Sequence, residues 1–289
     1  MASMTRRRRR ANLLIFLLLL GLALLFLAPI FIVVMNSFKG QFYIADAPFS
    51  FPTFTPGEDG SPRTFVGFQN YLSGQEKIDF LSAFGCSLLI TVLSVGAIVL
   101  FTAMTAWFLV RVRTRTSSAL YYLFVFSMIV PFQMVMFPMS KIANLLHLDN
   151  PLGIVLIYLG FGAGLSVFLF AGFIRSIPLE IEEAAMMDGC GPLQTFFRVI
   201  FPILRPTAIT VAILNAMWVW NDYLLPYLVI GSRYRTIPVA VQYLQGGYGS
   251  RDMGALMAML VLSILPIVVF YLTCQRHIIA GVVAGAVKG

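Results

Sequence analysis

A short charged segment interrupts an otherwise apolar sequence between residues 175 and 206. Pro178 is followed by an acidic stretch, 180–183, and then by the small and flexible residues Ala184, Ala185, Met186 and Met187. Proline suits the first turn of a helix, and acidic residues there oppose the positive end of the helix dipole. Gly189 accepts the left-handed conformation that ends helices. The pattern therefore predicts a short helix that stops at Gly189.

A second amphipathic stretch follows this turn. It opens at Gly191-Pro192 and continues through Ile200, and Pro202 and Pro206 lead into the next apolar run. The first short helix has little polar cover, because alanine and methionine dominate its second half. A surface of this kind favours docking of another protein over catalysis. An ordinary solvated loop is the alternative interpretation.

Polar residues inside an apolar run give a second candidate site. Asp222 is the only ionisable residue placed well inside a predicted helix, and a charge within a membrane is costly and usually functional. Val211, Asn215, Trp218 and Asp222 share one helix face at about 100° per residue. Amide and carboxylate groups bind hydroxyls, and an aromatic ring stacks on a sugar. We predict a solute path with two further candidates, Asn221 and Gln133. The alternatives are a polar seam against a partner subunit or a position at the outer interface of the membrane.

The composition indicates an integral membrane protein. Of 289 residues, 59% are hydrophobic and 11% are charged, with a mean hydropathy of +0.88, whereas a soluble domain carries about 25% charged residues. A spanning helix needs about 20 apolar residues. Six runs approach or exceed this length, which predicts an all-α protein with six transmembrane helices at about 11–35, 80–110, 117–140, 152–174, 207–230 and 253–274.

Two of the predicted helices have distinctive internal residues. Pro131 and Pro138 lie inside 117–140, so this helix should be kinked or broken. The helix at 152–174 contains glycines that allow close packing: Gly153, Gly160, Gly162, Gly164 and Gly172. A stripe of small residues along 80–110 indicates a similar packing seam. The long segment 36–79 is rich in aromatic residues, which argues against simple disorder.

The net charge of +8 does not indicate nucleic-acid binding, because Arg6–Arg10 directly precede the first apolar run. Basic residues in this position fix topology and contact anionic lipid. We therefore expect a cytosolic N-terminus at 1–10, a six-helix transmembrane domain at 11–274 and a cytosolic tail at 275–289. Within the domain we expect an outer loop at 36–79 and a cytosolic loop at 175–206. The first apolar run is too long for a cleaved signal peptide, the alternative for this segment.

The charged segment also carries a family resemblance. The pattern E-A-A-x-x-D-G, with later phenylalanine and prolines, is present as Glu183, Ala184, Ala185, Asp188, Gly189, Phe196, Pro202 and Pro206. It resembles the EAA loop of permease subunits in binding-protein-dependent ABC importers, with Cys190 at a position that is normally alanine. Residues 68–71 (FQNY), 218–222 (WVWND) and the ending at 280–289 resemble the carbohydrate branch, in particular the maltose-type second permease.

This resemblance implies a complex in a bacterial or archaeal cytoplasmic membrane. Its partners would be a sister permease, a dimer of cytosolic ATP-binding subunits and an extracytoplasmic solute-binding protein. The residues implied in ATPase coupling are Glu182, Glu183, Ala184, Ala185, Met187, Asp188 and Gly189, with Glu183 pairing with a basic group of the ATPase; residues 285–289 would also touch it. The chain lacks the phosphate-binding motif G-x-x-x-x-G-K-[ST]. It is therefore expected to be a transport subunit without cofactor, metal or enzymatic activity.

Other functions stay open at this point. Within the family, the solute could be a polyol, a glycerol phosphate or another non-sugar, and most solute contacts of maltose-type pairs fall on the other permease. Asp222 and the proline-containing third helix are also compatible with a self-sufficient ion-coupled carrier. A membrane enzyme is disfavoured, because the two histidines, His147 and His277, do not suggest a nucleophile–base pair.

Overall fold

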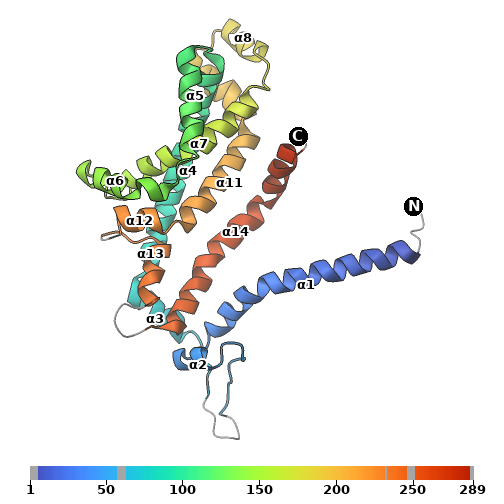
Figure 1. Cartoon of the computed structure of the whole chain (residues 1–289), viewed down its shortest axis with the longest axis vertical. Coiled ribbons are helices and arrows are strands. Elements are labelled where there is room, and N and C mark those ends of the chain that lie inside the picture. Colours follow the sequence, from blue (N-terminus) through green and yellow to red (C-terminus); the bar gives the residue numbers. More distant parts are fainter. Residues whose placement is uncertain (1–5, 57–62, 232, 246–250, 287–289) are drawn as a thin grey trace. The chain divides into compact units, whose positions relative to one another are not determined.

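The computed structural model describes residues 6–56, 63–231, 233–245 and 251–286 (Figure 1). The chain divides into two compact units. Unit 1 comprises Met1–Phe80 and Val241–Leu265, and unit 2 comprises Leu81–Ala240 and Pro266–Gly289. The described residues are almost entirely helical, apart from connecting segments and one isolated antiparallel bridge between Lys39 and Phe65. This agrees with the predicted all-α class.

Unit 1 contains the first apolar helix and the segment that follows it. Helix α1, Arg6–Asn36, includes Pro29 and exposes its apolar side chains from 11 to 27 around its whole circumference. Two short helices follow, α2 at Gln41–Asp46 and α3 at Gln69–Ile78. A helix that is apolar on every side and unburied within its own chain requires lipid or a partner subunit around it.

Several aromatic residues of segment 36–79 pack against one another within unit 1, whereas Phe42, Phe49 and Phe51 are largely exposed. Phe38 lies between Phe65, Phe68 and Tyr71, with ring centroids 5.6–6.2 Å apart. Asn70 is buried, and its amide donates to the carbonyls of Ser37 and Lys39, both at 2.8 Å. Residues 57–62 lie outside the described part of this segment. The FQNY sequence thus supplies the rings and the buried amide that order the chain after α1.

Within unit 1, an ion pair joins the last turn of α3 to the residue directly before α14, Met253–Ala286. The Lys77 ammonium contacts the Asp252 carboxylate, which also accepts from the backbone N–H of Ala255 at 2.9 Å. Burial alone would raise the pKa of Asp252, but these two hydrogen bonds and the lysine charge outweigh it and hold the pKa below its ordinary value.

Unit 2 is built on α4, Phe80–Arg111, and α7, Gly153–Ile174. The predicted stripe of small residues on α4 faces inward only in part. The buried members are Ser87, Thr91, Ser94, Thr102, Ala103 and Ala106, and the exposed members are Ser82, Gly85 and Gly96. Two helices lie between α4 and α7 in the sequence. They are α5, Arg115–Ser127, and α6, Phe132–Leu145, and they are bent by 105° relative to each other. Pro131 occupies the N-cap of α6 in an extended conformation, so the prediction that this helix is kinked or broken is confirmed.

The predicted fifth helix, 207–230, is wrong as one continuous element. Helix α11 runs from Arg205 to Asn221, Asp222 is extended, and a separate α12 covers Leu224–Val229. The Asp222 side chain accepts from the backbone N–H of Leu224 at 3.0 Å, so it caps the second helix instead of lying inside the first. Pro226 has no N–H to donate to the Asp222 carbonyl four residues earlier, so a continuous helix through Asp222 is also disfavoured by the backbone. The unit also contains the start of α13, Ile237–Gln242, which continues into unit 1.

By length and composition, four helices in the described part of the chain could cross a membrane: residues 11–36 of α1, α4, α7, and α14 up to Arg276. The number rises to six if each of two bent pairs forms one span. One pair is α5 with α6, and the other joins Pro192–Ile203 to α11 at a bend of 77°.

Candidate coupling site

The predicted short helix is present as α8, Glu180–Met187, and ends in a complete Schellman motif. The N–H of Gly189 donates to the carbonyl of Met186, and the N–H of Cys190 donates to that of Ala185, both at 3.0 Å. Gly189 has φ = +84°, in the left-handed region where a side chain would be strained. Asp188 is the residue between the helix and this turn. The sequence thus located the stop of the helix correctly, for the predicted reason.

The two sides of α8 have opposite environments. Glu182 and Ala185 are buried, with 4% and 8% of their surface exposed, respectively. Glu183, Ala184 and Asp188 are exposed, and Met187 is 89% exposed. The exposed side therefore presents an acidic, small and methionine-rich surface, whereas Glu182 and Ala185 face the protein itself and are not available to a partner in this conformation.

Glu182 is held by a polar clamp from the end of α4. One oxygen accepts from the Arg111 guanidinium at 2.7 Å, and the other accepts from the Trp107 indole N–H at 3.0 Å. Arg111 also donates to the carbonyl of Ile177 at 3.0 Å, just before α8. Because the charges are buried, paired and hydrogen-bonded, this arrangement fixes the position of α8 relative to α4. We call Trp107, Arg111 and Glu182 the anchor triad.

The sequence analysis missed two members of the anchor triad. Trp107 and Arg111 are four residues apart and therefore lie on one face of α4. This spacing was visible in the sequence, but Arg111 also marks the end of an apolar run and was interpreted only as a topological charge. Nothing in the sequence indicates that its partner is the residue directly before the EAA pattern.

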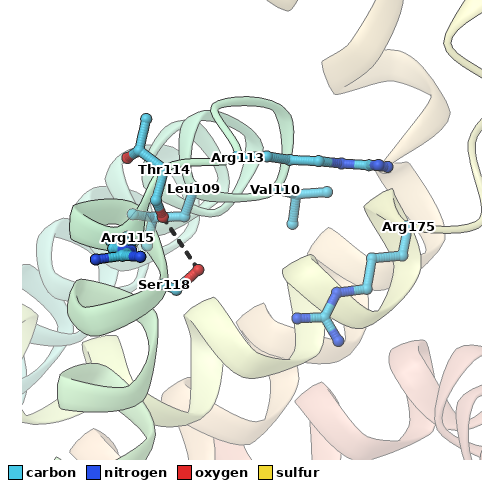
Figure 2. A pocket seen from close by; sticks show the side chains of 7 residues that line it. All are labelled: Leu109, Val110, Arg113, Thr114, Arg115, Ser118 and Arg175. Carbon is cyan, nitrogen blue, oxygen red and sulfur yellow. Dashed lines mark hydrogen bonds between the residues drawn. The ribbon is translucent and has the colours of Figure 1, made fainter.

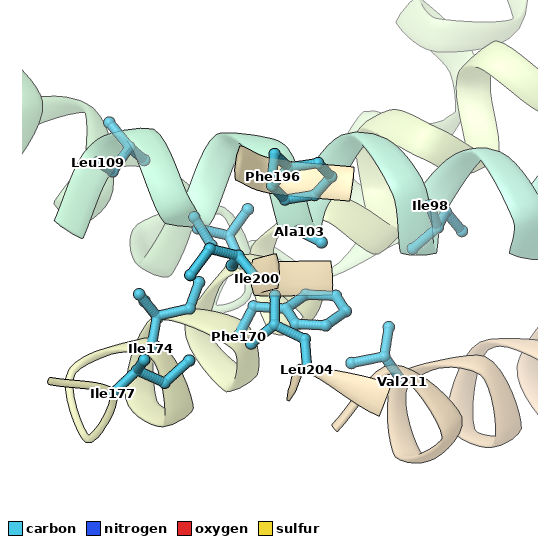
Figure 3. Close-up of a cluster of buried hydrophobic side chains, with 13 residues drawn as sticks. Ile98, Ala103, Leu109, Phe170, Ile174, Ile177, Phe196, Ile200, Leu204 and Val211 are labelled. Atoms are coloured by element: carbon cyan, nitrogen blue, oxygen red, sulfur yellow. The ribbon is translucent and has the colours of Figure 1, made fainter. Parts of the chain in front are cut away.

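Beneath the triad lies the apolar core of unit 2 (Figure 3). After Gly189 the chain forms α9, Pro192–Thr195, then a π-helical turn at Phe196–Ile200 and α10, Phe201–Ile203. Phe196 is fully buried, and its ring lies 5.6 Å from that of Trp107. Ile200 at the end of this turn and Leu204 directly after α10 belong to the same cluster as Phe170 on α7. The second amphipathic stretch thus packs the α8 region onto α4 and α7.

The candidate solute-path residues do not form one open polar face. The Tyr158 hydroxyl on α7 donates to the Asp222 carboxylate at 3.0 Å, and the Trp218 ring packs edge-on against Tyr158 at 5.3 Å. Asn215 is buried and donates to Ser166 Oγ at 3.2 Å and to the Val211 carbonyl at 2.8 Å. The predicted face therefore turns toward α7 of the same chain. Contact of this face with a solute or with a partner permease stays a prediction.

The remaining two candidates lie apart from this face. Asn221 is exposed and donates to the carbonyl of Met217 at 2.7 Å, one turn earlier in α11. Gln133 is exposed in the first turn of α6. Neither is brought against Asn215 or Asp222 by a hydrogen bond among the described residues. In the part of the chain that the structure describes, no group of three His, Cys, Asp or Glu side chains could hold a metal ion.

Comparison with known proteins places this architecture in a family. The sequence profile described as "Binding-protein-dependent transport system inner membrane component" matches residues 98–283, a range that includes the anchor triad and α8. The chain belongs to this family. Its members are transport components of the inner membrane and not enzymes, which agrees with the predicted multi-pass membrane location.

Relatives of this permease-family chain extend over nearly its whole length. A probable starch degradation products transport system permease protein of Thermoanaerobacterium thermosulfurigenes is 38% identical over 92% of this chain and 93% of its own length. A multiple sugar-binding transport system permease protein of Streptococcus mutans is 34% identical over 92% and 93%, respectively. A melibiose, raffinose and stachyose import permease protein of Bacillus subtilis is 32% identical over 78% and 82%.

The fold is also found in a solved structure. A chain of a bacterial ABC transporter involved in the import of the acidic polysaccharide alginate matches 96% of this chain and 99% of its own length. The TM-score is 0.74 at 23% sequence identity, so this likeness supports the fold and carries no information on the solute.

Proposed function

We propose that this chain is a membrane-spanning subunit of an ATP-driven importer for a sugar or oligosaccharide, coupled to its ATPase through α8. The observation that carries the proposal is the two-sided nature of α8. Its outer side is exposed, whereas Glu182 on its inner side is tied to α4 by a buried ion pair. A force applied to the exposed side reaches a long apolar helix directly, because packed and hydrogen-bonded elements move together.

The division of roles follows from burial. Glu183, Ala184, Met187 and Asp188 form the surface for a cytosolic ATP-binding subunit, with Glu183 as the charged contact. Glu182 and Ala185 support that surface from behind, which replaces their predicted role as direct contacts. Gly189 allows the chain to reverse into α9. The permease domain then requires a sister permease, a pair of ATPase subunits and an extracytoplasmic binding protein to complete the importer.

The sugar assignment rests on the named cargo of the relatives, which are permeases for starch degradation products, multiple sugars and raffinose-type oligosaccharides. It covers the solute class and not the individual sugar. We place the solute path within the pair of permeases, because Asn215, Trp218 and Asp222 are partly occupied by contacts to α7. Uptake of a polyol or a glycerol phosphate instead of a sugar would revise the proposed solute class.

The test measures whether α8 is needed for sugar uptake and for binding of the ATPase. In membranes that contain the complete importer, we expect Glu183→Ala combined with Gly189→Pro to abolish sugar uptake and to reduce co-purification of the ATPase at least about tenfold, the effect of roughly 1.4 kcal/mol of lost binding. Glu180→Ala, on an exposed residue of the same helix, is the matched control and should retain both. Normal uptake by the double variant would remove α8 from the mechanism.

A further inference from the structure

A basic cavity lies beside the anchor triad, at the junction of α4, α5 and α7. It has a volume of about 690 Å³ and is lined by three arginines, Arg113, Arg115 and Arg175, together with the hydroxyl residues Thr114 and Ser118 (Figure 2). These residues come from the turn between α4 and α5 and from the residue that caps α7. Three separate helix ends thus contribute to one concave surface.

No acidic side chain lines this cavity. Within the described residues, the ion pairs join Lys77 to Asp252 and Arg111 to Glu182, so none of the three lining arginines is neutralised by a carboxylate. The Arg175 guanidinium lies over the Tyr121 ring at 5.0 Å, a cation–π contact that holds it in place. The cavity therefore presents three positive charges, one of them pre-oriented, to a ligand that the protein itself does not supply.

The position of the cavity restricts the class of ligand. Helices α4 and α7 are candidate spans, and both end here, at Arg111 and Ile174. Leu109 and Val110 add an apolar wall, and Phe108 and Tyr122 nearby in sequence are 54% and 68% exposed. Basic residues next to apolar surface at the cytoplasmic ends of spanning helices match the headgroup level of a bilayer.

We propose that this cavity binds the phosphate-bearing headgroup of an anionic phospholipid, with the acyl chains along the exposed apolar surface of α4 and α5. The arginines supply charge-assisted hydrogen bonds to the phosphate. The hydroxyls serve the turn itself, because Ser118 donates to the Thr114 carbonyl at 3.1 Å and the Thr114 hydroxyl accepts from the Ser117 N–H at 3.1 Å. A free phosphate ion would leave most of the cavity and its apolar wall unused. The proposal rests on the orientation given under the proposed function, in which these helix ends face the cytosol.

Native mass spectrometry of the full chain, released from its membrane in mild detergent, tests the proposal. The probes are phosphatidylglycerol, phosphatidylcholine and inorganic phosphate. We expect retained phosphatidylglycerol in clear excess over phosphatidylcholine. Arg113→Gln with Arg175→Gln should weaken phosphatidylglycerol binding at least about tenfold, since each arginine near an anionic surface contributes a factor of about five. The charge-conserving variant Arg113→Lys with Arg175→Lys should retain most of it.

The matched control is Arg198→Gln, an exposed arginine of the π-helical turn that does not line the cavity. It should bind phosphatidylglycerol as the wild type does. Equal retention by the double glutamine variant, or equal binding of phosphatidylcholine, would overturn the proposal. Displacement of the lipid by millimolar inorganic phosphate would instead assign a soluble anion site. The docking variant Glu183→Ala should leave lipid binding unchanged, so failure of ATPase coupling and failure of this site are distinguishable.

Discussion

Adjacent glutamates in this protein have opposite tasks. Glu182 is buried against Trp107 and Arg111, whereas Glu183 is exposed one residue later. Successive residues of a helix point about 100° apart, so the EEAA sequence places one carboxylate in the protein and the other on its surface. Residue type alone does not distinguish them.

We predict that Glu182→Gln destabilises the chain by about 1–3 kcal/mol, because it removes the negative charge beside the partly buried Arg111, which keeps its hydrogen bond to the Ile177 carbonyl. The measurement is the thermal unfolding temperature in detergent. In a cycle built from Arg111→Met and Glu182→Leu, the double variant should cost less than the sum of these two single changes. Glu183→Gln is the control and should unfold like the wild type. Strict additivity of the two single changes would show that the ion pair carries no coupling energy.

A second prediction at this scale concerns pH. The Asp252 pKa lies below its ordinary value of 3.8, so its contribution to stability is complete above that ordinary value and is lost as the pH falls through the lower, folded-state pKa. We expect unfolding temperatures of the wild type to fall more between about pH 5 and pH 2 than those of Asp252→Asn, which keeps the cap but not the charge. Parallel curves for the two proteins would contradict this assignment.

At the scale of elements, glycines in α7 decide how closely neighbouring segments approach. A methyl group on Gly164 would lie 2.8 Å from the Phe124 carbonyl and 2.7 Å from Ser127 Oγ of α5. The Cβ position of Gly160 has no neighbour within 4 Å. The predicted tight packing of this helix is therefore confirmed at Gly164 but not at Gly160, since only one of them faces a backbone.

We expect Gly164→Ala to destabilise the chain by about 1–3 kcal/mol through overpacking against α5. Gly160→Ala should be neutral or stabilising by up to about 1 kcal/mol, because alanine favours helix formation. Both values come from unfolding of the purified variants under one detergent condition. Equal effects of the two substitutions would mean that the close contact of α7 with α5 contributes little.

At the scale of the whole molecule, the chain exposes more apolar surface than a self-contained protein would. The 18-residue window of α1 that marks it as a span is 0% buried, and that of α14 is 22% buried. Lipid accounts for part of this surface, and a second permease subunit accounts for the remainder in our proposal. The chain is therefore expected to act only within a complex.

This expectation separates an importer subunit from an ion-coupled carrier. We predict that the chain reconstituted alone transports no sugar under a proton or sodium gradient, and that uptake begins when the sister permease, the ATPase, the binding protein and ATP are present. Radiolabelled sugar accumulation in proteoliposomes is the measurement. Gradient-driven uptake by the isolated chain would favour the carrier, for which Asp222 and the broken α5–α6 pair were the motivation.

Much of this protein was predictable from local sequence. The apolar runs located α4 and α7 to within one residue at each end and located the apolar part of α1, because the length of an apolar run follows bilayer thickness. Helix α14 begins where predicted but continues past the predicted end at 274 as far as Ala286, since a helix is not limited to the apolar part of its sequence. Prolines predicted the break before α6, and the glycine after Asp188 predicted the end of α8, because both act on the backbone of their own turn. The EAA pattern led to the family that the comparison established.

The tertiary structure decided what each polar side chain does. It turned Glu182 inward onto Arg111 and directed Asn215 toward Ser166 on α7. It also gathered Arg113, Arg115 and Arg175 around one cavity from helix ends that are far apart in sequence. Hydropathy and backbone propensity report interactions within one segment. The partner of a polar group depends on which segments meet, and that is set by the packing of all the helices together.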